Sequence, residues 1–242
     1  YGDHRDLHRL IRRQRQMCIR DRFNMDIPHM TGYTAPVSGG RRFLSGLFMY
    51  TVTKLNRCRV RGKINDDDVE GSAYLQKVGL NNPALPWYWA VVHFEDGSVL
   101  KYFFPHIGPS MFRKGASDIR SHIHDHLWIP AKREMEFYYA AEDRLYTFDR
   151  FKFKKVFRGE LPQFHGEFWN KKERISFVLS SYARTYFAFA PAGRKIVRPS
   201  LYYNEYPVTV SSLALRGDGV QITDNMLGGG MGNAEHTWGY LI

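Results

Sequence analysis

The feature that most constrains the fold is a hairpin signature in the first half of the chain. Two runs of aromatic and β-branched residues, 87–94 (WYWAVVHF) and 99–104 (VLKYFF), flank a short linker that contains Asp96-Gly97. Asp-Gly between two such runs is among the strongest short-range signals for a β-hairpin, because both residues tolerate positive φ. We therefore expect two antiparallel strands joined by a tight turn.

The rest of the chain repeats this pattern. Short segments rich in aromatic and β-branched residues alternate with turn signals, and we find no sustained helical period. Further strands are predicted at 47–61, 70–79, 134–140, 143–157, 174–182, 184–190, 200–215, 219–224 and 234–241. The predicted fold class is all-β: an antiparallel barrel around an aromatic-rich cavity for an apolar ligand.

The N-terminal segment, residues 1–42, is not expected to contribute to the fold. Residues 13–22 resemble the translation of a sequencing adapter, and the end of the segment is rich in Gly, Pro, Ser and Thr. We interpret the segment as disordered or artefactual. The expected natural start is Met25 or Met30, and ordered structure is expected to begin near Phe43.

A weak internal repeat links the two ends of the remaining chain. Val52-Thr53 matches Val208-Thr209, and Arg61-Gly62 matches Arg216-Gly217. Further along each copy, Gly71-Ser72-Ala73 matches Gly232-Asn233-Ala234. Matches that recur in the same order indicate duplicated units. We place the two β-units at 43–150 and 151–242.

Several short motifs extend this interpretation. They are Gly71–Lys77 (GSAYLQK), Pro86–Trp89 (PWYW), Asp96–Ser98 (DGS), Tyr203–Tyr206 (YNEY) and Gly232–Gly239 (GNAEHTWG). Together they resemble the lipocalin-like AttH and carotenoid 1,2-hydratase (hydroxyneurosporene synthase) superfamily. The resemblance implies two consecutive lipocalin-like barrels, and its hydratases add water to a terminal isoprenoid double bond. The first motif lacks the acidic and His residues frequent in relatives, so any chemistry is expected in the second copy.

Hydration of an isolated alkene needs a strong proton donor, aromatic faces that stabilise a cation, and a positioned water. The candidate catalytic residues are Glu235, Glu205 and His236. The candidate ligand-binding residues are Tyr74, Gln76, Trp87, Trp89, Tyr203, Asn204 and Trp238. A carboxyl group could act as the donor if burial raised its pKa toward neutrality. The chemistry needs no metal and no nucleotide cofactor.

Two alternatives stay open for these residues. The two glutamates could pair with Arg or His at a barrel end while the aromatics form an ordinary core, and the protein would then be a non-catalytic carrier of an apolar molecule. A metal-dependent enzyme is a third hypothesis, because His122, His124 and His126 are spaced to share one face of a strand. Nearby Pro130 and the irregular surroundings favour a solvated loop for this segment.

The formal net charge is +11, and the run Arg150–Arg158 alternates Phe with Lys or Arg. A strand with one buried face gives this alternation. The functional alternative is peripheral contact with an anionic membrane; we expect no nucleic-acid partner, since no recognition motif accompanies the charge. The expected partner is an apolar small molecule, an isoprenoid or lipid. Cys18 and Cys58 allow at most one disulfide, and we expect a cytoplasmic protein.

Overall fold

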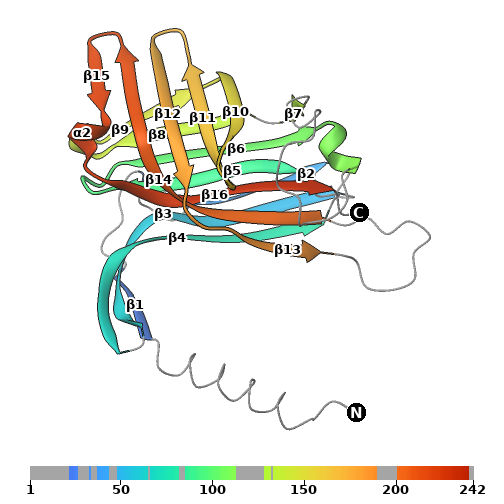
Figure 1. The fold of residues 1–242 in the computed structure, drawn as a ribbon, viewed down its shortest axis with the longest axis horizontal. Helices are drawn as coiled ribbons and strands as arrows, with labels where there is room; N and C mark the ends of the chain where they lie inside the picture. Colours follow the sequence, from blue (N-terminus) through green and yellow to red (C-terminus); the bar gives the residue numbers. More distant parts are fainter. Residues whose placement is uncertain are drawn as a thin grey trace. The chain divides into compact units, whose positions relative to one another are not determined.

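The structure of the protein, a computed structural model, describes residues 22–26, 33, 37–43, 48–64, 66–81, 85–112, 128–131, 133–189 and 201–239. More than three quarters of these residues lie in β-strands (Figure 1), which confirms the predicted all-β class. Backbone contacts divide the chain into two compact units. One comprises Tyr1–Gly39 with Val52–Val78, and the other comprises Gly40–Thr51 with Gly79–Ile242.

The smaller of two sheets is organised around β3 (Phe48–Ile64), which pairs with β1 (Arg22–Asp26), β2 (Val37–Phe43) and β4 (Asp67–Asn81). β3 and β4 confirm the strands predicted at 47–61 and 70–79. The strands β1 and β2 were not predicted, because the sequence analysis placed the first ordered residue near position 43. A long strand leaves a row of main-chain donors and acceptors at its edge. Residues 22–26 pair with residues 59–63 of that edge.

Among the described residues, the larger sheet contains twelve strands. They are β5 (Trp87–Phe94), β6 (Val99–Ile107), β7 (Ile129–Pro130), β8 (Glu134–Tyr139), β9 (Arg144–Phe148), β10 (Arg150–Arg158), β11 (Leu161–Trp169), β12 (Glu173–Ser181), β13 (Thr185–Phe189), β14 (Leu201–Gly217), β15 (Val220–Thr223) and β16 (Gly230–Gly239). The order is β10-β11-β12-β14-β16-β5-β6-β8-β9, with β13 and β15 on β14 and β7 on β6. Helical structure includes short turns at Pro109–Phe112, Ala140–Glu142 and α2 (Asp224–Leu227).

Strands from both predicted units, 43–150 and 151–242, belong to this one sheet. The predicted segment 143–157 is two strands, β9 and β10, which stand at opposite ends of the strand order. Only Asp149 separates them, so the two edges of the sheet meet at that point. The matched repeat positions lie on β3 and β4 and on β14 and β16, and the division into duplicated halves stays a prediction.

The Asp-Gly hairpin is confirmed between β5 and β6. Phe94 N donates to Ser98 O at 3.0 Å, and Gly97 N donates to Phe94 O at 3.1 Å. Asp96 Oδ1 accepts from Ser98 N at 2.8 Å. Gly97 has φ of 102°, a conformation that favours glycine because it has no Cβ.

Aromatic rings on one face of the sheet form the core. Tyr102 on β6 lies 5.9 Å from Phe177 on β12, and Phe104 lies 5.6 Å from Phe168 on β11, measured between ring centroids. These strands are separated by β14, β16 and β5 in the sheet order, so the contacts require the sheet to curl back on itself. The result is a curled, antiparallel half-barrel (Figure 1). Aromatic rings pack on its concave side.

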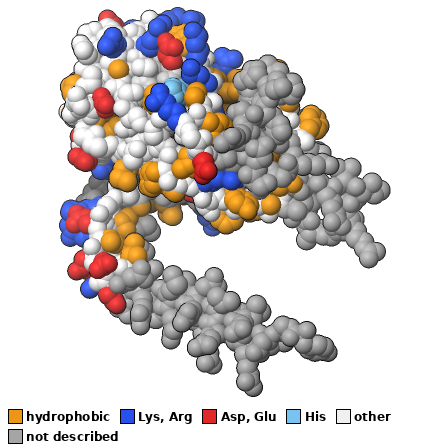
Figure 2. All heavy atoms as spheres, in the orientation of Figure 1, with side chains coloured by type: hydrophobic (Ala, Val, Ile, Leu, Met, Phe, Trp, Pro, Cys, Tyr) orange, Lys and Arg blue, Asp and Glu red, His pale blue; other side chains and the backbone are white. Residues whose placement is uncertain are grey.

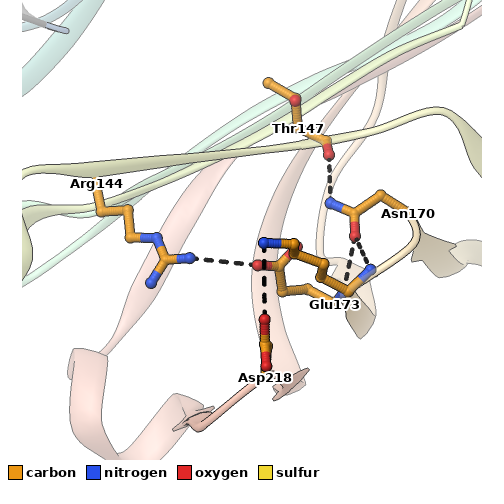
Figure 3. Close-up of polar contacts among 6 residues, drawn as sticks. Arg144, Thr147, Asn170, Glu173 and Asp218 are labelled. Carbon is orange, nitrogen blue, oxygen red and sulfur yellow. Dashed lines mark hydrogen bonds and ion pairs between the residues drawn. The ribbon is translucent and has the colours of Figure 1, made fainter.

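A polar cluster fixes the turn between β11 and β12 (Figure 3). Asn170 Oδ1 accepts from Lys172 N at 2.8 Å and from Glu173 N at 2.7 Å, and Asn170 Nδ2 donates to Thr147 O on β9 at 2.9 Å. Glu173, only 7% exposed, pairs with Arg144 at 3.3 Å. The turn is therefore joined to β9 by one hydrogen bond and one ion pair.

Candidate functional site

Glu235 lies on β16, between β14 and β5. The strand registers place Glu235 opposite Glu205 on one side and opposite Trp89 on the other. Directly paired residues of neighbouring strands point to the same face of a sheet, and successive residues of one strand point to opposite faces. The preceding residue, Ala234, belongs to the aromatic core. Glu235, Glu205 and Trp89 therefore point away from that core.

Both carboxyl oxygens of Glu235 accept a hydrogen bond from an aromatic side chain. Tyr203 Oη donates to Oε1 at 2.6 Å, and Trp87 Nε1 donates to Oε2 at 2.7 Å. The backbone N of Trp87 donates to Thr237 Oγ1 at 2.7 Å, which fixes the start of β5 beside β16. Across the strand pair, Glu205 Oε1 accepts from Asn233 Nδ2 at 2.5 Å. The structure thus brings together five predicted residues on one face of the sheet: Glu235, Glu205, Trp87, Trp89 and Tyr203.

Burial raises the pKa of Glu235 from 4.5 to about 7. The hydrogen bonds from Tyr203 and Trp87 act in the opposite direction, since they stabilise the ionised form, and the nearby charge of Glu205 raises the pKa further. Burial, followed by the neighbouring Glu235 carboxylate, also raises the pKa of Tyr203 above its ordinary value. A substantial fraction of Glu235 is therefore protonated at neutral pH.

Aromatic rings cluster around Tyr203, one of the two donors to this carboxyl group. The Tyr203 ring centroid lies 6.1 Å from that of Trp87 and 6.2 Å from those of Phe187 and Phe189 on β13. Phe187 and Phe189 are about half exposed, at 51% and 49%. An apolar molecule that contacts these two rings would therefore lie close to Tyr203, the residue that binds the Glu235 carboxyl. No protein-family model, curated protein or solved structure matches this chain.

His236, Asn204 and Trp238 are buried on the opposite face of the sheet. Lys155 Nζ lies 3.1 Å from His236 Nδ1, and the imidazole stacks on Tyr88 with ring centroids 4.2 Å apart. Asn204 Oδ1 accepts from Arg184 at 2.7 and 3.0 Å. The structure does not bring these three predicted residues to the Glu235 carboxyl, because adjacent positions of β16 alternate between the two faces.

Tyr74 and Gln76, two further predicted ligand-binding residues, lie on β4 in the other compact unit. Their side chains share one face of that strand, and Tyr74 Oη donates to Gln76 Oε1. The resemblance of the Gly71–Lys77 motif suggested their role, and their binding role stays a prediction.

The histidine segment predicted as a metal alternative, His122 to His126, lies outside the described residues. Within the part of the chain that the structure describes, no three His, Cys, Asp or Glu side chains gather in a way that could hold a metal ion. In that same part, no helix is both long and apolar enough to cross a membrane.

Three neighbours of the predicted residues were not predicted: Phe187, Phe189 and Lys155. Residues 184–190 were predicted as a strand, and their alternating aromatics were visible. What was not visible is the pairing of β13 with β14, which sets Phe187 opposite Tyr203. Lys155 was taken as part of a charged strand face, whereas its side chain reaches His236.

Proposed function

We propose that this chain is a carotenoid 1,2-hydratase-like lyase, which adds water to an isoprenoid or other apolar alkene with Glu235 as the acid. The observation that carries the proposal is the carboxyl group of Glu235, which burial keeps partly protonated near pH 7 beside a cluster of aromatic rings. A two-barrel, lipocalin-like origin of the fold belongs to the same proposal. It is supported by the repeated positions on β3 and β14 and by the curled antiparallel sheet.

The hydrogen bonds of Glu235 locate the acidic proton. The indole Nε1 of Trp87 can only donate, so Oε2 must accept in both protonation states. A carbonyl oxygen accepts hydrogen bonds better than the hydroxyl oxygen of an acid, so the bond from Trp87 favours a neutral acid with its proton on Oε1, which faces Tyr203 Oη. A phenol both donates and accepts, so Tyr203 can pass its own hydroxyl proton to the alkene while it receives the proton of Glu235.

The reaction then proceeds by general acid catalysis. The proton adds to one alkene carbon, and the positive charge develops on the more substituted carbon. The faces of Trp87, Phe187 and Phe189 stabilise this cation. Water attacks it to form the alcohol, and the proton that the water loses returns to the Glu235 carboxylate. Atoms balance as alkene plus water to alcohol, and the acid is regenerated.

Turnover of an acyclic carotenoid in detergent micelles, carried out in water enriched in heavy oxygen, tests the proposal. The wild-type protein should yield a tertiary alcohol that contains the heavy oxygen, and activity should fall as the pH rises through about 7 because the acid form is depleted. Glu235→Gln should abolish turnover and retain substrate binding. Glu167→Gln, at an exposed ion pair with Arg174, is the matched control and should keep full activity.

The carrier hypothesis is the second candidate, favoured by the half-exposed Phe187 and Phe189. It predicts quenching of Trp87 fluorescence by the bound apolar molecule with no alcohol formed, and equal affinity in the wild-type protein and Glu235→Gln. Wild-type product formation that depends on Glu235 would exclude it. Binding without product would instead exclude the hydratase.

A further inference from the structure

β10, an edge strand of the large sheet, has one basic face. Its inward positions carry Phe151, Phe153 and Lys155, which contact other rings or His236. The basic side chains on its outward face are all exposed: Arg150, Lys152, Lys154 and Arg158. Alternate residues of a strand are about 6.6 Å apart, so the row from Arg150 to Arg158 extends about 26 Å along the sheet surface.

The neighbouring strand adds little negative charge to this face. The register sets Lys154 opposite His165 and Lys152 opposite Glu167 on β11. Glu167 is the single carboxylate among the outward positions of β10 and β11, and Arg174 lies 3.1 Å from it. Two further carboxylates, those of Asp149 and Glu160, flank the two ends of the row. Figure 2 shows Lys and Arg side chains gathered at the top of the view, at the end of the molecule where β10 to β12 lie.

His165 reports the positive field of this face. Burial lowers the pKa of His165, and the charges of Lys154 and Arg158 lower it further. An anionic surface brought against the row would neutralise part of that field, and the pKa of His165 would rise. This side chain can therefore serve as a probe of whatever binds here.

The chemistry of the face favours lipid headgroups over nucleic acid. Single-stranded nucleic acid is bound through aromatic side chains on which its bases stack, combined with cations along its backbone. None of the large hydrophobic side chains exposed in the described part of the chain lies on the outward positions of β10 or β11. The indole of Trp169, at an outward position of β11, is half-buried, and the Arg174 guanidinium lies 5.8 Å from its ring centroid. A row of exposed cations with this one partly covered ring matches a surface of negatively charged headgroups better than a series of stacked bases.

We propose that the outward face of β10 and β11 docks this protein on an anionic phospholipid membrane. The contact is electrostatic and peripheral, and it is made by Arg150, Lys152, Lys154 and Arg158. It is independent of the acid chemistry assigned to Glu235, which lies on other strands of the sheet.

Co-sedimentation with vesicles tests the proposal. The full chain should bind vesicles that contain phosphatidylserine, should not bind vesicles of phosphatidylcholine alone, and should be released by salt. Each basic residue near such a surface contributes about fivefold to partitioning, so Lys152→Gln with Lys154→Gln should weaken binding about 25-fold. The matched control is Lys63→Gln with Lys77→Gln, two exposed cations of the smaller sheet. This control removes the same charge and should change binding less than about twofold.

An NMR titration of His165 gives an independent readout. Phosphatidylserine vesicles should raise its pKa in the wild-type protein, and phosphatidylcholine vesicles should not. Equal weakening in both double variants would show an effect of net charge alone and would overturn the proposal. So would absence of binding to anionic vesicles, or an unchanged His165 pKa on binding. Binding to duplex or single-stranded nucleic acid in preference to anionic vesicles would assign the face to that partner instead.

Discussion

The raised pKa of Glu235 makes the stability of the folded protein depend on pH in a specific window. In the unfolded chain the carboxyl ionises near 4.5, whereas in the folded protein it ionises near 7. Between these values the folded state holds one more proton than the unfolded state, so the free energy of unfolding falls as the pH rises. The slope is about 1.4 kcal/mol per pH unit, and the total loss is up to about 3 kcal/mol.

Glu235→Gln removes this dependence without removing the hydrogen bonds. The amide oxygen can still accept from Trp87 Nε1, and the amide nitrogen can donate to Tyr203 Oη, as the protonated acid does in the proposed mechanism. We expect the variant and the wild-type protein to be about equally stable near pH 4.5. The variant should become more stable by up to about 3 kcal/mol as the pH passes 7.

Urea unfolding at a series of pH values measures this difference directly. Subtracting the wild-type curve from that of Glu235→Gln cancels the contributions of the other titrating groups. Glu167→Gln is the control for removal of a surface carboxylate, and an exposed ion pair of this kind contributes no more than about 1 kcal/mol. A difference between Glu235→Gln and wild type that stays constant from pH 4.5 to 8 would refute the assigned pKa. A carbon NMR titration of the Glu235 carboxyl with its midpoint near 4.5 would refute it as well.

Three further predictions concern individual contacts. Tyr203→Phe should raise the pKa of Glu235 in the same NMR titration, since the lost hydrogen bond stabilises the carboxylate; an unchanged midpoint would contradict this. Gly217→Ala should lower the free energy of unfolding by more than about 2 kcal/mol, because Gly217 has φ of 154° and a Cβ there would lie 2.2 Å from a backbone oxygen. Gly159→Ala is the control: Gly159 has open space around it, and the substitution should lower the free energy of unfolding by only about 1 kcal/mol. Equal costs for the two glycines would show that the close contact relaxes. Asn170→Ala should lower the stability by about 1 to 3 kcal/mol in urea unfolding, because it removes the side-chain bonds that hold the turn (Figure 3); no loss would show that water replaces them.

The elements that were predicted correctly are those whose conformation depends on residues close together in the sequence. The Asp96-Gly97 hairpin and most strands follow from turn chemistry and alternation, which need no knowledge of the rest of the chain. β11 was missed because Pro162 and Gly166 interrupt its pattern. The reason for Gly166 is tertiary, since a Cβ there would lie 2.4 Å from the ring of Phe177. The sequence of β11 alone cannot show that ring.

Part of the candidate site could also be predicted from the sequence, and part depends on how distant strands pair. Glu235, Tyr203 and Trp87 were each predicted, but their contacts depend on pairings between strands that are far apart in sequence. The separation of Glu235 from His236, in contrast, follows from the sequence alone. Both were placed in a predicted strand, 234–241, and neighbouring residues of a strand cannot face one cavity.

Successive side chains of β16 point to opposite faces of the sheet, so the position of Glu235 depends on how β16 pairs with its neighbours. β16 is held on both sides, by β14 and by β5, so the position of Glu235 is fixed by two hydrogen-bonded ladders. A slip of one residue in either ladder would turn Glu235 toward the aromatic core and His236 outward. The core opposes this slip, because Ala234 fits among rings where a carboxylate would be left without its two donors. The same packing that sets the register of β16 therefore also holds the Glu235 carboxyl between Tyr203 and Trp87.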